Sequence, residues 1–460
     1  MRKFTALIAS LTFGWQTIFA QPTTDGQIMY DIPLVDYPFM KYPAKTDYAT
    51  NNTWLNPSMN QAIATSSDVY FLVHSNLKKI FLKKKPDKFW NKVGLQFAVL
   101  SSDALTQYMP FGYVWTHEEF HRAIMTKNLV GSQDDANRFK FFSGGLSISG
   151  SRDEDLAKMK RDHVKDFVRM HEAGLEADYQ LIHNLEKNNF FLNQQLPNEI
   201  LYNASTLYAI VYVNSSSRSL NDKVIDTKNA TETDILKRDC TGRDFSAWTY
   251  HLFNQSQPYE SLGTHPTGIG INRYIKTTQL NTDELNYLRK QGNLAFINLA
   301  SPMLLGFQKI AIYKDDHERI FYINFAARHY LTSFGNDICL QFFYQKKNQN
   351  WLCTLHNYNN YSHHFIGLEA ENYLKEIKIG KRNSYLSTRA MLWTQPHNQE
   401  FMSSKSAFGG LVEAKYNYPI YKNFFGNIAF TAKTNGWVAG NEFLNANISS
   451  RMGVAMLINK

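Results

Sequence analysis

The segment from Trp115 to Arg122 holds the residues whose types and spacing best suit chemistry. It reads Trp-Thr-His-Glu-Glu-Phe-His-Arg and contains the pattern H-E-x-x-H. Residues four apart lie on one face of a helix, so His117 and His121 can present two imidazoles to one metal ion. Glu118 follows the first histidine, where its carboxylate can take a proton from a water molecule on that metal. The pattern indicates a metal-dependent hydrolase with Glu118 as the general base.

Such a site needs a third ligand, because a catalytic zinc ion usually takes three protein ligands and leaves the fourth position to water. A long helix predicted downstream contains His-Glu-Ala-Gly-Leu-Glu-Ala-Asp over residues 171–178. Glu172 and Glu176 are four apart and share a face of that helix. Alanines flank Glu176 and would let two helices come close, which favours Glu176 as the ligand and leaves Glu172 as the alternative. Asp178 can orient a ligand imidazole, as metal-bound histidines usually require.

These two stretches resemble those of the gluzincin metallopeptidases. In that family H-E-x-x-H supplies two ligands and the base, and a glutamate on a later helix supplies the third ligand. The resemblance implies Zn²⁺ held by His117, His121 and Glu176, Glu118 as the base, and a peptide or protein substrate. It covers only the two short stretches. The Glu-Ala-Asp that begins at Glu176 is also two residues shorter than the E-x-x-A-D box of one branch of the family.

The composition narrows the class of protein further. A chain of 460 residues is long enough for two or three domains. The net charge of +9 is modest for this length, and the one dense basic block is Lys78–Lys88, so nucleic acid is not an expected partner. The three cysteines are too few for a disulfide scaffold, although Cys339 and Cys353 could meet across a hairpin.

The N-terminus has the pattern of a secretory signal peptide over residues 1–20. It has a basic start, an apolar run from Ala6 to Trp15, and a small residue at Ala20. Residues 21–55 contain several prolines and predict an extended arm. No uninterrupted apolar segment reaches the roughly 18–20 residues of a membrane helix. The sequence therefore predicts either a soluble exported protein or one that crosses a membrane as a β-barrel.

Apolar residues at helical spacing predict a mainly helical domain over residues 56–303, and the resemblance implies that it is metallopeptidase-like. A polar stretch, Asn214–Asp244, interrupts it and predicts a loop or insertion. The expected helices are Asn56–Phe81, Phe89–Met109, Tyr113–Met125, Asp155–Lys187, Asn198–Tyr212, Phe245–Asn254 and Asp283–Asn298.

From residue 304 to residue 460 the pattern changes to strict alternation, as in Leu411–Tyr418 and Phe424–Lys433. About eight antiparallel strands are expected there. The export signal, the aromatic content of 14% and polar rows opposite apolar ones favour an outer-membrane β-barrel. The alternative is a soluble β-sandwich, and the chain ends on Ile-Asn-Lys rather than on the aromatic residue of many barrels.

Together these features predict an α+β multidomain protein: a zinc metalloprotease exported to the outer membrane of a Gram-negative bacterium. Its expected partners are a peptide or protein substrate and outer-membrane lipid. A periplasmic or secreted location is the alternative. The competing function is a non-catalytic outer-membrane barrel protein whose helical part serves binding or assembly. The sequence does not indicate the oligomeric state.

Overall fold

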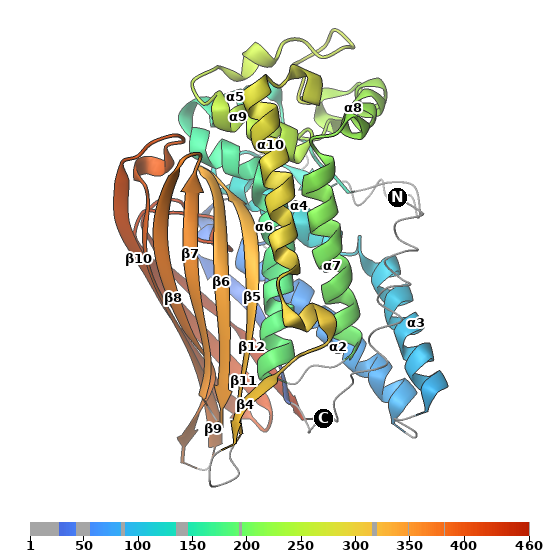
Figure 1. The fold of residues 1–460 in the computed structure, drawn as a ribbon, viewed down its shortest axis with the longest axis vertical. Helices are drawn as coiled ribbons and strands as arrows, with labels where there is room; N and C mark the ends of the chain where they lie inside the picture. The colour runs from blue at the N-terminus through green and yellow to red at the C-terminus, as the bar shows by residue number, and fades with distance from the viewer. Residues whose placement is uncertain are drawn as a thin grey trace.

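The computed structural model describes residues 27–42, 56–83, 88–134, 146–192, 196–314, 320–347, 349–380 and 382–459. The predicted signal peptide lies outside these ranges. Within them the chain forms a group of helices and one large antiparallel sheet, which confirms the predicted combination of a helical region with such a sheet (Figure 1). Among the described helices, none has the length and apolar composition needed to cross a membrane.

Ten strands form the large sheet. Its spatial order is β1, then β12 to β4 in descending number, so the nine C-terminal strands form a continuous meander. The bounds are β1 Gln27–Tyr37, β4 Ile310–Lys314, β5 Ile320–Thr332, β6 Gly335–Lys346, β7 Gln349–Asn360, β8 His363–Ile379, β9 Arg382–Pro396, β10 Ser406–Tyr421, β11 Phe424–Lys433 and β12 Asn447–Asn459. A separate small pair is formed by β2 (Gln133–Asp134) and β3 (Ile148–Ser149).

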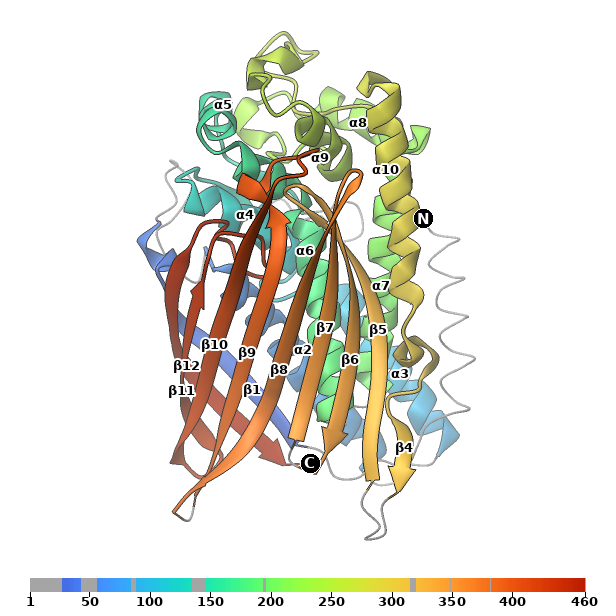
Figure 2. The same ribbon diagram turned by 60° about the vertical axis from the view of Figure 1, so that its left-hand side comes forward.

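The sheet curves strongly but does not close into a barrel within the described residues, because β1 and β4 remain its two edges. The predicted barrel is therefore not confirmed, and neither is the two-sheet sandwich. Figure 2 shows the strands bending around the long helix α6 (Val164–Phe191). Three polar contacts tie this helix to inward-facing side chains of the sheet: Lys187 with Glu371, His183 with Gln341, and Asn188 with Tyr373.

The predicted N-terminal arm supplies a strand to the sheet. β1 pairs with β12 in a register that places Gln27 opposite Asn459. The hydrophobic core is also shared, since one cluster joins helical residues such as Phe167 to sheet residues such as Phe343 and Trp393. The helical part and the sheet are therefore packed around a common core, and residue 303 does not separate two independent cores.

The helices begin and end near the predicted positions, with two exceptions. The stretch Asn214–Asp244, predicted to be a loop or insertion, contains the helix α8, so that prediction was wrong there. The helix expected over Asp155–Lys187 is divided at His163, whose backbone is not helical (φ −139°, ψ 49°). Ser58 caps α2 through a reciprocal capping box with Gln61. The bounds are α2 Met59–Leu82, α3 Phe89–Thr106, α4 Tyr113–Lys127, α5 Asp153–Asp162, α7 Leu196–Ser215, α8 Ser219–Thr231, α9 Asp244–Phe253 and α10 Thr282–Leu294.

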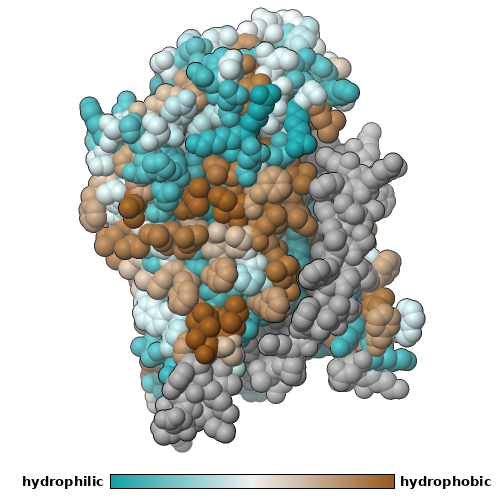
Figure 3. Space-filling model, viewed as in Figure 1, coloured by the Kyte–Doolittle hydropathy of each residue, from teal (hydrophilic) through white to brown (hydrophobic). Residues whose placement is uncertain are grey.

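The two faces of the sheet differ in polarity. Outward-facing side chains are apolar and exposed: Ile366 is 63% exposed, Leu368 61% and Leu392 56%. Their inward-facing neighbours include the ion pair of Glu369 and Arg389. Figure 3 shows hydrophobic residues gathered in a band across the middle of the molecule, below a hydrophilic upper region formed by helices and loops. A soluble sheet normally buries its apolar face, whereas this sheet exposes an apolar outer face in addition to the apolar residues that it contributes to the core.

The alternation also separates the two cysteines that the sequence placed on a hairpin. Cys339 is buried on the inner face of β6, whereas Cys353 is exposed on the outer face of β7. The register pairs Cys339 with His356 and Cys353 with Phe342. Both cysteines are free thiols, so the disulfide considered from the sequence is not formed.

Candidate metal centre

The two histidines of H-E-x-x-H lie on α4 where this helix crosses α6. A Cβ atom added at Gly174 of α6 would lie 2.3 Å from Nε2 of His117 and 2.4 Å from Nε2 of His121. Both ring nitrogens therefore point at the same small space above the α6 backbone. Glycine in a helix interior costs about 1 kcal/mol relative to alanine, and here its missing side chain keeps that space open.

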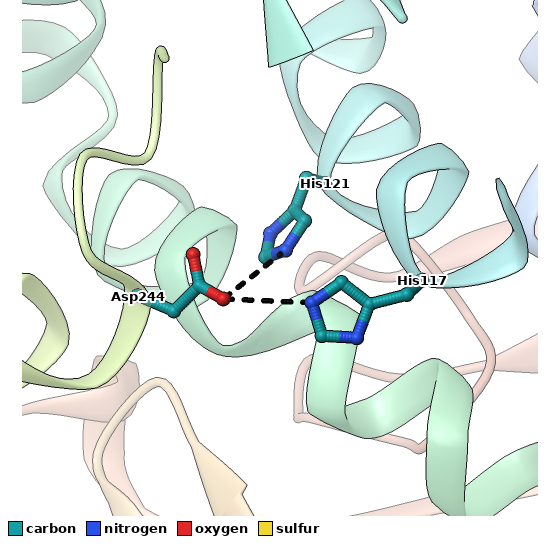
Figure 4. A group of neighbouring side chains, drawn as sticks. All are labelled: His117, His121 and Asp244. Atoms are coloured by element: carbon teal, nitrogen blue, oxygen red, sulfur yellow. Dashed lines mark hydrogen bonds and ion pairs between the residues drawn. The ribbon is translucent and has the colours of Figure 1, made fainter. Parts of the chain in front are cut away.

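Asp244, the first residue of α9, brings a carboxylate to the same point (Figure 4). Its Oδ2 lies 3.4 Å from His117 Nε2 and 4.0 Å from His121 Nε2. The three ligand atoms lie within 4.8 Å of one another, and all three residues are buried. Around a tetrahedral zinc ion with bonds of roughly 2.0–2.2 Å, neighbouring ligand atoms lie about 3.3 Å from each other. The group thus has the donor types and nearly the spacing of a zinc centre.

Each histidine is held through its other ring nitrogen. Nδ1 of His117 donates to Asp178, with both carboxylate oxygens 3.2 Å away. Nδ1 of His121 donates to the carbonyl oxygen of Met170. A proton fixed on Nδ1 leaves the lone pair on Nε2, which is the arrangement that metal-bound histidines use. Asp178 therefore orients the imidazole of His117, the role that the sequence predicted for it.

His171 shows the same arrangement one turn of α6 before Gly174. Its Nδ1 lies 3.0 Å from the carbonyl oxygen of Thr241. Its Nε2 is buried and has no hydrogen-bond partner among the described residues. Burial lowers the pKa of His171 to about 3, so the ring is neutral. A neutral imidazole beside the three ligands can act as a further donor to a metal ion or to a bound substrate.

Electrostatics at the centre favour a cation. Burial lowers the pKa of His117, but the carboxylates of Asp178 and Asp244 outweigh this and raise it well above the usual value. Burial would raise the pKa of Asp244, yet His117 and His121 hold it below its ordinary range. Asp244 also accepts a hydrogen bond of 2.5 Å from the Tyr212 hydroxyl. The carboxylate is therefore ionised, and a metal ion that binds here displaces a proton from His117.

Glu118, the predicted general base, is buried next to His117 and is 8% exposed. Burial raises the pKa of Glu118 well above its usual value, and the nearby charges of Asp239 and Asp244 act in the same direction. His117 acts in the opposite direction, because its positive charge favours the carboxylate. A carboxylate with a raised pKa is a stronger base than an ordinary glutamate.

The predicted third ligand, Glu176, lies elsewhere. It forms a buried ion pair with Arg169 at 2.8 Å and accepts a hydrogen bond from the backbone of Gly440. Glu172 is also buried, with Arg169 and Glu176 as its charged neighbours. Neither glutamate belongs to the group formed by the two histidines and Asp244. Helical phase explains the difference: positions two residues from Gly174 point to the opposite side of α6.

The structure adds residues that sequence reasoning missed, above all Asp244. It lies 127 positions after His117, at the end of the stretch predicted to be a polar loop or insertion. An aspartate at the start of an apolar helix is ordinarily explained by its favourable effect on the helix N-terminus. Tyr212 carried no sequence signal as part of a site, and Gly174 carried only its small size, which predicts the close approach of another helix. Comparisons with family models, curated proteins and solved structures found no match.

Proposed function

We propose that this protein is a zinc-dependent hydrolase that cleaves peptide bonds. The observation that carries the proposal is the convergence of His117 Nε2, His121 Nε2 and Asp244 Oδ2 above Gly174. Two nitrogens and one carboxylate oxygen are ligands that zinc prefers, and three protein ligands leave a position for water, as in catalytic sites. The same three ligands also suit related divalent ions, so the choice of zinc is part of the proposal.

When bound, zinc supplies Lewis acidity, which activates water for attack on a carbonyl carbon. Glu118 receives the proton of the attacking water on its carboxylate. It then delivers that proton to the nitrogen of the leaving amine as the C–N bond breaks. Asp178 and the Met170 carbonyl hold the two imidazoles in orientation, and Tyr212 holds Asp244 through its hydroxyl. The order H-E-x-x-H, with a glutamate directly after the first histidine, favours peptide-bond hydrolysis.

The same proposal includes a location at a lipid bilayer, the outer membrane of a Gram-negative cell. It is supported by the exposed apolar outer face of the sheet and the charged inner face. Strands β5–β12 have 10–17 residues, and a tilted strand needs roughly 9–11 to cross a bilayer. The helices α4 and α9, which carry the three ligands, lie near one end of the sheet (Figure 2).

The test of catalysis is the variant Glu118→Gln, assayed with zinc-loaded protein on a library of unstructured synthetic peptides. Zinc content should be unchanged, because Glu118 is not a ligand. The rate of cleavage should fall by about 10²- to 10⁴-fold, the usual contribution of a general base. Glu154→Gln makes the same chemical change at an exposed position of α5 and should leave the rate unaltered.

Two results would overturn the proposal. Unchanged cleavage by the Glu118→Gln protein would exclude Glu118 as the base. If the zinc-loaded wild-type protein cleaves none of the peptides, peptide hydrolysis is wrong even where zinc binds. The second outcome would favour the non-catalytic binding or assembly protein.

A further inference from the structure

A second group of metal-ligating side chains lies on the inner face of the sheet, away from α4 and α9. Asp337 and Cys339 are two apart on β6, so both point inward. His356 on β7 pairs directly with Cys339 in the strand register and also points inward. The arrangement is fixed by backbone pairing between adjacent strands, not by a loop.

The ligand atoms of these three residues are close together. One oxygen of Asp337, the sulfur of Cys339 and one ring nitrogen of His356 lie within 4.8 Å of one another. Nδ1 of His356 donates a hydrogen bond of 2.7 Å to Asp337 Oδ2, and a metal ion that binds here displaces that proton. The three residues are 0%, 1% and 7% exposed, respectively, so water does not solvate the group freely.

Glu369 faces the other nitrogen of the His356 ring, in the position of the carboxylate that accompanies many metal-bound histidines. Nε2 of His356 lies 3.4 Å from Oε2 of Glu369 on β8. Arg389 fixes that carboxylate through two contacts of 2.7 and 3.0 Å. Once a metal ion has displaced the Nδ1 proton, the proton that remains on Nε2 faces Glu369, and the Nδ1 lone pair is directed at Asp337 and Cys339. This carboxylate–histidine arrangement sets the tautomer and orientation in many zinc sites.

Two further features indicate room and need for a cation. Oδ1 of Asp337 is buried and has no hydrogen-bond partner among the described residues. A buried carboxylate oxygen left in this way is unfavourable unless a cation or donor meets it. Asp337, Cys339 and His356 also line a cavity of about 270 Å³ between the sheet and α6. The fourth position of a tetrahedral ion can therefore face this cavity.

We propose that Asp337, Cys339 and His356 form a second metal site that binds Zn²⁺, with Glu369 positioning His356. A set of one oxygen, one sulfur and one nitrogen ligand suits zinc, and the thiolate disfavours Mg²⁺ and Ca²⁺. The ion joins β6 to β7 on the inner face. This site does not depend on catalysis at the first centre, because it shares none of its ligands.

The sulfur ligand makes the second site spectroscopically distinct from the first. Purified full-length protein is loaded with Co²⁺, and the thiolate-to-cobalt charge-transfer absorption is recorded together with the bound cobalt per chain. The wild-type protein should bind two ions and show this band. Cys339→Ser should bind one ion and lose the band. The double variant His117→Ala/His121→Ala should also bind one ion but keep the band.

The other two cysteines provide matched controls. Cys353→Ser changes the exposed outer face of β7, and Cys240→Ser changes a buried thiol outside the sheet. Both should retain the band and two ions. Glu369→Gln keeps every ligand and should weaken cobalt binding at this site by about 10- to 100-fold, the usual effect of removing such a partner.

Three results would overturn the second site. The first is a wild-type protein with no charge-transfer band and a single bound ion. The second is loss of the band in Cys240→Ser or Cys353→Ser with retention in Cys339→Ser. If Cys339→Ser fails to fold, His356→Gln, which leaves the thiol in place, decides: an unchanged band and stoichiometry would show that His356 is not a ligand.

Discussion

At the scale of single residues, Gly174 is the most informative position of the candidate centre. The Nε2 atoms of His117 and His121 lie over it at distances that leave no room for a methyl group. Its role is steric: the absent side chain lets α4 approach α6 and leaves space where a metal ion can sit. Helix propensity alone would favour alanine at this position by about 1 kcal/mol.

Gly174→Ala should therefore abolish zinc binding at the centre. The overpacking should cost about 1–3 kcal/mol, which outweighs the gain in propensity and lowers the free energy of unfolding. Zinc titration and denaturant unfolding measure the two effects. Gly94→Ala in α3 is the control, because its new Cβ meets only the side chain of Phe81. A Gly174→Ala protein that binds zinc like the wild type would contradict the proposed position of the ion.

At the scale of elements, the sequence predicts what local periodicity encodes. The helix that carries His117 and His121 and the alternating strands after residue 304 follow from spacing alone. Spacing does not show which residues of α6 face the metal centre, because side chains on both sides of this helix are buried. Glu176 turns toward Arg169 and toward Gly440 in the connection between β11 and β12, whereas Asp178 contacts His117 on α4. Spacing along one helix cannot decide which buried face meets another helix.

Non-local pairing accounts for the other differences at this scale. β1 reaches the sheet by pairing with the last strand, β12, and no local pattern in the arm specifies that partner. Asp244 reaches the histidines because α9 packs against α6, which also cannot be read from one segment. The division between α5 and α6 at His163 involves neither glycine nor proline, so it carries no sequence signal.

At the scale of the whole molecule, the sheet exposes an apolar outer face and encloses charged pairs. Charged pairs such as Arg451 with Glu413 lie on its inner face, while leucine, isoleucine and phenylalanine side chains cover its outer face. Water is a poor solvent for an apolar surface of this size, and monomeric soluble proteins rarely expose one. We therefore propose that acyl chains of a bilayer cover the outer face, with the charged network shielded inside.

Leu368→Arg tests this placement, because Leu368 is 61% exposed on the outer face of β8. In phosphatidylcholine vesicles the variant should lose about 2–4 kcal/mol of unfolding free energy, the usual cost of arginine on a lipid-facing strand at the midplane. Glu260→Arg, on the exposed surface of the helical part, should change stability by less than about 0.5 kcal/mol. Equal stability of Leu368→Arg and the wild-type protein in vesicles would exclude a lipid-facing sheet.

We propose that His117, His121 and Asp244 hold one zinc ion. The most direct measurement is an anomalous difference map at the zinc absorption edge from crystals of the zinc-loaded wild-type protein. Zinc bound in this site should give a peak about 2.0–2.2 Å from Nε2 of both histidines and from a carboxylate oxygen of Asp244. The absence of a peak at this position, or a peak bound to Glu172 or Glu176 in its place, would contradict it.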